Sequence, residues 1–159
     1  MKFLSRFFDV NVADQTEKSA QPDLDALLAL AEMDIATAIA AHEDWKQRLL
    51  QCVASMDGKL SEDFFPEVIC RDDCCDLGKW LHGPGRKRFG HYRAFSVLVA
   101  RNEYFHAQAA LAVAQALSGN KEEAGRILNG SFRLASNQVL LMLKELKKNL
   151  RAGGGGAPG

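Results

Sequence analysis

Residues 24–56 read LDALLALAEMDIATAIAAHEDWKQRLLQCVASM, and this stretch decides the fold class. Its mostly apolar seam advances in steps that alternate between four and three residues, through Leu24, Leu28, Ala31, Ile35, Ala38, His42, Trp45, Leu49, Cys52 and Met56. Such steps place all of these side chains on one face of a single helix. We expect this helix to begin at Pro22 and to end at Asp57-Gly58.

The same periodicity predicts two further long helices. The second runs from about Arg86 to Leu117, with a seam of Phe95, Val99, Asn102, His106, Ala109, Val113 and Ala116. The third follows a tight turn at Ser118-Gly119-Asn120 and continues to about Arg151, with inward residues Leu128, Phe132, Ala135, Val139, Met142 and Leu146. Helices that are apolar along one face bury that face against one another.

A short helix is expected between the first and second long helices. It runs from Cys75 to Leu81 and is stopped by Gly83-Pro84-Gly85, whereas residues 57–74 read as irregular. No strand-like alternation of useful length occurs in the sequence. The predicted fold is therefore all-α, a four-helix-bundle-like arrangement of three long helices plus a short helix that carries Cys75.

Length and composition favour a single ordinary domain. The chain has 159 residues, of which 47% are hydrophobic and 25% charged, and its 20 basic residues balance its 20 acidic ones. Balanced charge gives no electrostatic basis for a nucleic-acid partner, and no run approaches the length of a transmembrane segment. We expect an N-terminal segment and linker at 1–21, the bundle at 22–151 and a disordered glycine-rich tail at 152–159.

The N-terminal stretch Met1–Val10 is apolar but too short and interrupted for a secretory signal. We therefore expect a cytoplasmic protein whose four cysteines are thiols rather than disulfides. The stretch itself is expected to form a short helix that packs on the bundle or on a partner. The alternative is weak contact with a membrane surface.

Polar residues on the inward seams are the candidates for a functional site. Asn102 and His106 are one helical turn apart and face the same way, and His42 faces inward from the first helix. Cys75 begins the short helix, where the helix N-terminus favours the metal-binding thiolate. Cysteine and histidine together are typical zinc ligands, although a buried histidine is more often a hydrogen-bonded core residue.

Three segments resemble the chemoreceptor zinc-binding (CZB) domain, and the resemblance extends over about residues 24–118. They are His42-Glu43-Asp44-Trp45-Lys46, Cys75-Asp76-Leu77-Gly78-Lys79-Trp80-Leu81 and Asn102-Glu103-Tyr104-Phe105-His106. The family signature is a histidine followed by an aromatic residue, then Cys-x-Leu-Gly-x-Trp, then His-x-x-x-His. The resemblance implies a zinc-binding helical bundle that is attached to bacterial chemoreceptors or to enzymes that make cyclic di-GMP. It also implies a sensor of zinc or oxidants that is commonly dimeric.

Carried over residue by residue, the resemblance makes His42, Cys75 and His106 three zinc ligands. Asn102 stands where the family has its remaining histidine, and an amide oxygen is a poor match for zinc. Three arrangements are open at this point. Water completes the tetrahedron, Asn102 binds weakly through oxygen, or the site is empty and Asn102 is hydrogen-bonded to His106.

The sequence thus predicts a zinc-binding regulatory or sensory module in bacterial signalling, which responds to zinc or to oxidation of the Cys75 thiolate. The alternative is a metal-free helical dimerisation module in which Asn102 has weakened or retired the site. We expect a homodimer, with chemotaxis or cyclic di-GMP signalling proteins as partners in trans. We expect no enzymatic activity, because Glu43 and Glu103 point away from the core and no general base is evident.

Two tryptophans and one glycine of these segments have expected packing roles. Trp45 and Trp80 are predicted to shield the metal site. Gly78 is predicted to let the short helix approach its neighbours closely.

Overall fold

Helices make up nearly all of the chain that the computed structural model describes, which is residues 31, 33–55 and 60–153. The first long helix covers residues 33–54, and no strand occurs within the described ranges. Both predicted boundaries of the first helix, Pro22 and Asp57-Gly58, lie outside those ranges. So do the predicted N-terminal segment 1–21 and the part of the predicted tail after residue 153. None of the described helices is long and apolar enough to cross a membrane.

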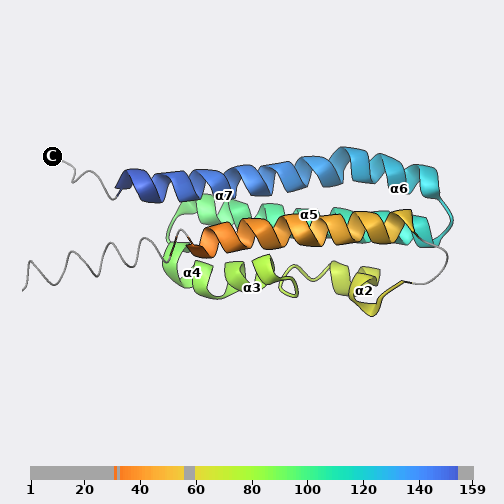
Figure 1. Cartoon of the computed structure of the whole chain (residues 1–159), viewed down its shortest axis with the longest axis horizontal. Helices are drawn as coiled ribbons and strands as arrows, with labels where there is room; N and C mark the ends of the chain where they lie inside the picture. Colours follow the sequence, from red (N-terminus) through yellow and green to blue (C-terminus); the bar gives the residue numbers. More distant parts are fainter. Residues whose placement is uncertain (1–30, 32, 56–59, 154–159) are drawn as a thin grey trace, which may run out of the picture.

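The remaining elements follow in a simple order. Short helices come first, namely η1 (Glu62–Phe64), α2 (Pro66–Ile69), α3 (Asp76–His82) and α4 (Pro84–Phe89). A long helix, a short helix, a π-helical turn and a second long helix complete the chain, namely α5 (Arg93–Leu117), α6 (Lys121–Ile127), η2 (Leu128–Phe132) and α7 (Arg133–Gly153). Figure 1 shows α2, α3 and α4 in a row along one side of the three long rods. The all-α, four-helix-bundle-like fold is confirmed, with this row of short helices as its fourth side.

The predicted seams form the core. The first helix buries Ala31, Ile35, Ala38, His42 and Leu49, which all belong to its predicted inward face. The buried residues group into two apolar clusters along the bundle, one around Phe105 and Phe132 and the other around Leu77 and Leu143. The two buried histidines, His42 and His106, both pack against Phe105 of the first cluster.

The prediction of one helix from Arg86 to Leu117 is wrong. The structure ends α4 at Phe89 and begins α5 at Arg93, because Gly90 closes α4 and Tyr92 has extended backbone angles. The break lets Phe89 and Phe95 both turn inward, with ring centroids 6.3 Å apart. Gly83-Pro84-Gly85 does stop the short helix as predicted, because Gly83 caps α3 after His82, and Pro84 then occupies the first turn of α4.

Residues 57–74 were predicted to be irregular, but the described part of this segment contains η1 and α2. Pro66 opens α2, and the buried side chains of Phe64 and Ile69 hold this segment against the cluster around Phe105. The helix is only four residues long, too short for any periodicity to be read from the sequence. This packing places the Ile69 backbone beside α5.

The third long helix contains an irregularity that the sequence did not indicate. Between α6 and α7, residues 128–132 form a π-helical turn, and both Ile127 and Phe132 are buried although they are five residues apart. A π turn adds one residue without breaking the helix, so the buried face continues on both sides of it. The helix then ends at Gly153, two residues beyond the predicted end.

Candidate metal centre

Cys75 is held at the start of α3 by local backbone geometry. It is the N-cap residue, with extended angles, and its Sγ accepts a hydrogen bond from the Gly78 backbone N–H at 3.2 Å. A Cβ atom added at Gly78 would overlap the Asp72 carbonyl oxygen. Glycine is therefore required here, and the close approach that it allows is to the loop before α3 rather than to another helix.

His106 is oriented at both ring nitrogens. Its Nδ1 lies 2.8 Å from the Ile69 carbonyl oxygen, and its Nε2 lies 3.3 Å from Cys75 Sγ. A carbonyl can only accept, so Nδ1 carries the proton and Nε2 presents its lone pair to Cys75. The Cys75 thiol then donates to Nε2. A histidine whose second nitrogen is fixed by a backbone carbonyl is arranged as metal-binding histidines usually are.

His42 faces inward as predicted, but its Nε2 has a partner that the sequence did not reveal. Nε2 lies 3.0 Å from the Ser136 hydroxyl of α7, and the imidazole packs against Phe105 with centroids 4.5 Å apart. Both His42 and Ser136 are buried. His42 is thus satisfied as a core residue, in the arrangement that the sequence left open as the alternative to a ligand.

Burial sets the protonation of all three groups. It lowers the pKa of His42 to about 3, with smaller contributions from the neighbouring Lys46 and His106. Burial also lowers the pKa of His106, against an opposing effect of its hydrogen bond to Ile69. The pKa of the Cys75 thiol is raised by burial, which outweighs the hydrogen bond from Gly78. The expected thiolate at the helix start is therefore a thiol in the metal-free protein, beside two neutral imidazoles.

Asn102 is the least satisfied polar residue of the core. It is 0% exposed, and within the described chain neither its amide oxygen nor its amide nitrogen has a hydrogen-bond partner. The predicted option of a hydrogen bond between Asn102 and His106 is therefore wrong, because both nitrogens of His106 are engaged elsewhere. An unpaired buried amide costs about 1–3 kcal/mol, which makes Asn102 a place where an added polar group would be stabilising.

The structure brings Cys75 and His106 into contact, whereas His42 contacts Ser136 and Asn102 has no hydrogen-bond partner among the described residues. Among the described residues, no three side chains of the His, Cys, Asp and Glu types converge into a ready-made cluster. Zinc holds thiolate sulfur at about 2.3 Å and imidazole nitrogen at about 2.0 Å, so these atoms are about 3.5 Å apart in a tetrahedral site. The 3.3 Å between Cys75 Sγ and His106 Nε2 fits that spacing. The donor types and this pair therefore fit zinc, and His42 would join them either through the ring nitrogen that Ser136 does not contact or by giving up that contact.

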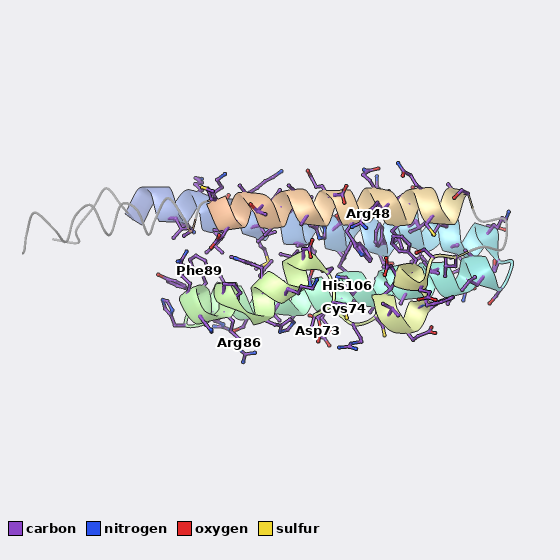
Figure 2. All side chains as sticks on the ribbon, turned by 60° about the horizontal axis from the view of Figure 1, so that its bottom comes forward. Arg48, Asp73, Cys74, Arg86, Phe89 and His106 are labelled. Carbon is purple, nitrogen blue, oxygen red and sulfur yellow. The ribbon has the colours of Figure 1, made fainter. Side chains whose placement is uncertain are left out.

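One side of the pair is open to solvent through a pocket of about 290 Å³ that reaches both Cys75 and His106. Figure 2 shows His106 and Cys74 near the middle of the bundle, away from the end that carries Phe89. Trp45 lines the pocket and packs on His106 with centroids 4.9 Å apart, which is the position that its predicted shielding role requires. Trp80 instead packs on Phe89 and Phe95, and its predicted shielding role is not what its ring contacts indicate.

Two participants were missed by sequence reasoning. Ser136 is polar and adjoins the inward position Ala135, so a serine beside an inward seam was the available signal. The Ile69 carbonyl had no signal at all, because a backbone acceptor is independent of residue type. The acids Glu43 and Glu103 are exposed, as predicted.

Fold and site together define an all-α domain with a partly buried thiol–imidazole pair suited to a transition metal. Residues 42–113 match the family model of the chemoreceptor zinc-binding domain, CZB. The resemblance predicted from the sequence is therefore confirmed over these residues, and the matched family is a zinc-binding domain of chemoreceptor-related signalling proteins. No curated protein and no solved structure matches the chain.

Proposed function

We propose that this chain is a zinc-dependent regulatory module in which His42, Cys75 and His106 hold the metal. The observation that carries the proposal is the contact between Cys75 Sγ and His106 Nε2, at 3.3 Å, together with the Ile69 carbonyl that orients the imidazole. Bound zinc would supply a fixed link between α3 and α5 that replaces the thiol proton. Metal binding to a thiol releases that proton, so affinity rises with pH.

In this proposal the fourth ligand of the zinc is a water molecule, and Asn102 is the residue that holds this water. Its unpartnered amide offers one acceptor and two donors next to His106 on α5. A water molecule as fourth ligand would donate a hydrogen bond to the Asn102 amide oxygen, and zinc would then not need direct ligation by that oxygen, which is a poor match for it. Three protein ligands bind less tightly than four, so the site is suited to reversible loading.

The signal is zinc availability or oxidation of Cys75. The pocket that reaches Cys75 would admit a small oxidant such as hydrogen peroxide. The thiolate takes one oxygen atom from the peroxide, which gives a sulfenic acid and water once a proton is added, and the sulfur is oxidised by two electrons. A sulfenic acid no longer serves as a thiolate ligand. Loss of the metal would then loosen α3 from α5.

The output is a change in contacts between proteins. We propose that the module acts as a homodimer and, in trans, on chemotaxis or cyclic di-GMP signalling proteins. CZB domains are regulatory rather than enzymatic, which agrees with a role through partners.

Metal content of the purified chain tests the zinc proposal. Near-stoichiometric zinc is expected in protein prepared without chelators, and Cys75→Ser should lose most of it. Cys70→Ser is the matched control, because Cys70 is exposed and lies outside the pocket. Peroxide should release zinc in step with modification of Cys75. Full modification with the zinc retained would reject the oxidant response.

One observation favours a second function, a metal-free helical interaction module. His42 and Ser136 already satisfy each other, and no three ligands converge in the described chain. If the site is retired, excess zinc followed by dialysis will leave sub-stoichiometric metal, and Asn102→His will restore binding. If the site is active, wild-type protein will retain zinc, and Asn102→His will only tighten it.

A further inference from the structure

Helix α5 carries a second apolar seam on the face opposite its buried one. The residues again advance in steps of three and four, through Val97, Ala100, Tyr104, Ala107, Leu111 and Ala114. The three large members are 42%, 43% and 45% exposed in chain order, and the alanines between them are exposed or half-buried. No charged residue falls on this seam. We call these six residues the outer seam.

A helix at the surface of a bundle normally pairs a buried apolar face with a polar outer face. Helix α7 follows that rule, because its exposed Leu134 and Leu141 are interspersed with Asn137, Lys144 and Lys148. Helix α5 does not follow it. An unbroken apolar seam of this period is the pattern by which one helix packs against another.

We propose that the outer seam docks against the outer seam of a second copy of this chain, with the two α5 helices antiparallel. Large and small residues alternate along the seam, so this direction puts an alanine opposite every large side chain: Val97 opposite Ala114, Ala100 opposite Leu111, and Tyr104 opposite Ala107 of the second copy. Each layer then holds one large and one small side chain and can interdigitate. A parallel pair would stack tyrosine on tyrosine and alanine on alanine.

Charge favours the same direction. Helix α5 has no acidic residue in its first turn and no basic residue in its last turn, so its dipole is uncompensated within the helix. Arg93 begins the helix, and the antiparallel register places it opposite Ser118, just after the last turn of the second α5. A cation at the carboxyl end of a helix is stabilising, whereas the same cation is unfavourable at its own amino end.

The seam is long enough for a helix–helix contact of several turns. Its 18 residues, Val97 to Ala114, span about 26 Å of helix, and flanking residues of α5 would add to the buried area. The symmetry axis falls between Tyr104 and Ala107, on the turn whose inner face carries Asn102 and His106. The interface thus belongs to the homodimer of the proposed function and rests on it, and it puts the two candidate metal centres back to back.

The association state of the full chain tests the interface. Sedimentation equilibrium should show a monomer–dimer equilibrium that Ala107→Glu weakens by about 100-fold, because a carboxylate would be buried against Tyr104 without a partner. Leu134→Glu on α7 is the matched control and should leave the equilibrium unchanged. Circular dichroism and zinc content are measured on the same samples, since these positions are exposed and the fold should persist.

A charge pair tests the direction. Tyr104→Lys and Ala107→Glu chains should each be monomeric and should dimerise when mixed, because the antiparallel register places lysine opposite glutamate. A wild-type monomer at all concentrations, or a dimer that Ala107→Glu leaves intact, would overturn the interface. Zinc retained by such a monomer would leave the metal module standing. Loss of zinc in a chain that still dimerises through this seam would reject the metal module alone.

Discussion

Two buried polar residues one turn apart on α5, His106 and Asn102, differ in how completely the chain satisfies them. His106 has a partner at each ring nitrogen, Ile69 on one side and Cys75 on the other. Asn102 is equally buried and has none among the described residues. Burial alone therefore does not mark a functional residue. The difference separates a position that the fold itself satisfies from one that it leaves without a hydrogen-bond partner among the described residues.

Removal of the His106 side chain should have the largest effect on the free energy of unfolding. His106→Ala leaves a cavity and an unpaired Ile69 carbonyl, and we expect it to lower the free energy of unfolding by about 3 kcal/mol. Urea denaturation of metal-free protein measures this loss, and zinc binding should disappear as well. His91→Ala, at an exposed position between α4 and α5, should change neither quantity. Unaltered zinc binding in His106→Ala would place the metal elsewhere.

Cys75, the side-chain partner of His106, can be displaced without being replaced. Gly78→Ala forces the Asp72 loop away from α3 and should cost about 2 kcal/mol while it weakens zinc binding, because Cys75 shifts with its cap. Gly125→Ala in α6 is the contrasting change, since a Cβ there meets no atom within 4 Å. It should stabilise the protein by up to about 1 kcal/mol. Equal effects of the two substitutions would show that the cap does not control the site.

Asn102 should respond in the direction opposite to His106. Asn102→Leu replaces the unpaired amide by an apolar group of similar size, and we expect metal-free protein to gain about 1 to 2 kcal/mol. The gain should shrink when zinc is present, because the wild-type amide then has a partner. Paired melts with and without zinc measure both values. A loss of stability without metal would mean that Asn102 is already satisfied.

The smallest effect concerns the third predicted ligand. Ser136→Ala removes the partner of His42 and should cost metal-free protein about 1 kcal/mol. The same change frees His42, so zinc affinity should rise by about fivefold, the equivalent of that free energy. Competition with a chromophoric chelator gives the affinity. A fall in zinc affinity would mean that Ser136 supports the metal-bound form instead.

The parts of the fold that sequence reasoning predicted are those that repeat along one helix. Alternating steps of four and three placed His42, Asn102 and His106 inside the bundle, and all three are buried. Cys75 has no such repeat, and only the family resemblance joined it to His106. The break between Phe89 and Arg93 was missed because the predicted seam begins only at Phe95, so periodicity gave no information about where the helix starts.

The details of the site could not be predicted because they depend on partners far apart in the chain. The contact of His42 with Ser136 spans 94 residues, and the contact of His106 with Ile69 spans 37. Periodicity identifies which face of a helix is buried but not which atom lies opposite. The raised pKa of Cys75 has the same origin, since the burial that causes it comes from packing rather than from its place in α3.

The π turn at residues 128–132 determines which side chains of the following helix face the core. Each residue of an α-helix advances the side-chain direction by about 100°, so one inserted residue would normally rotate everything that follows by that angle. The wide turn absorbs the insertion and keeps Phe132 and Ser136 on the side that faced inward before it. The π turn therefore helps to determine that the Ser136 hydroxyl faces His42, although it lies several residues earlier in the chain.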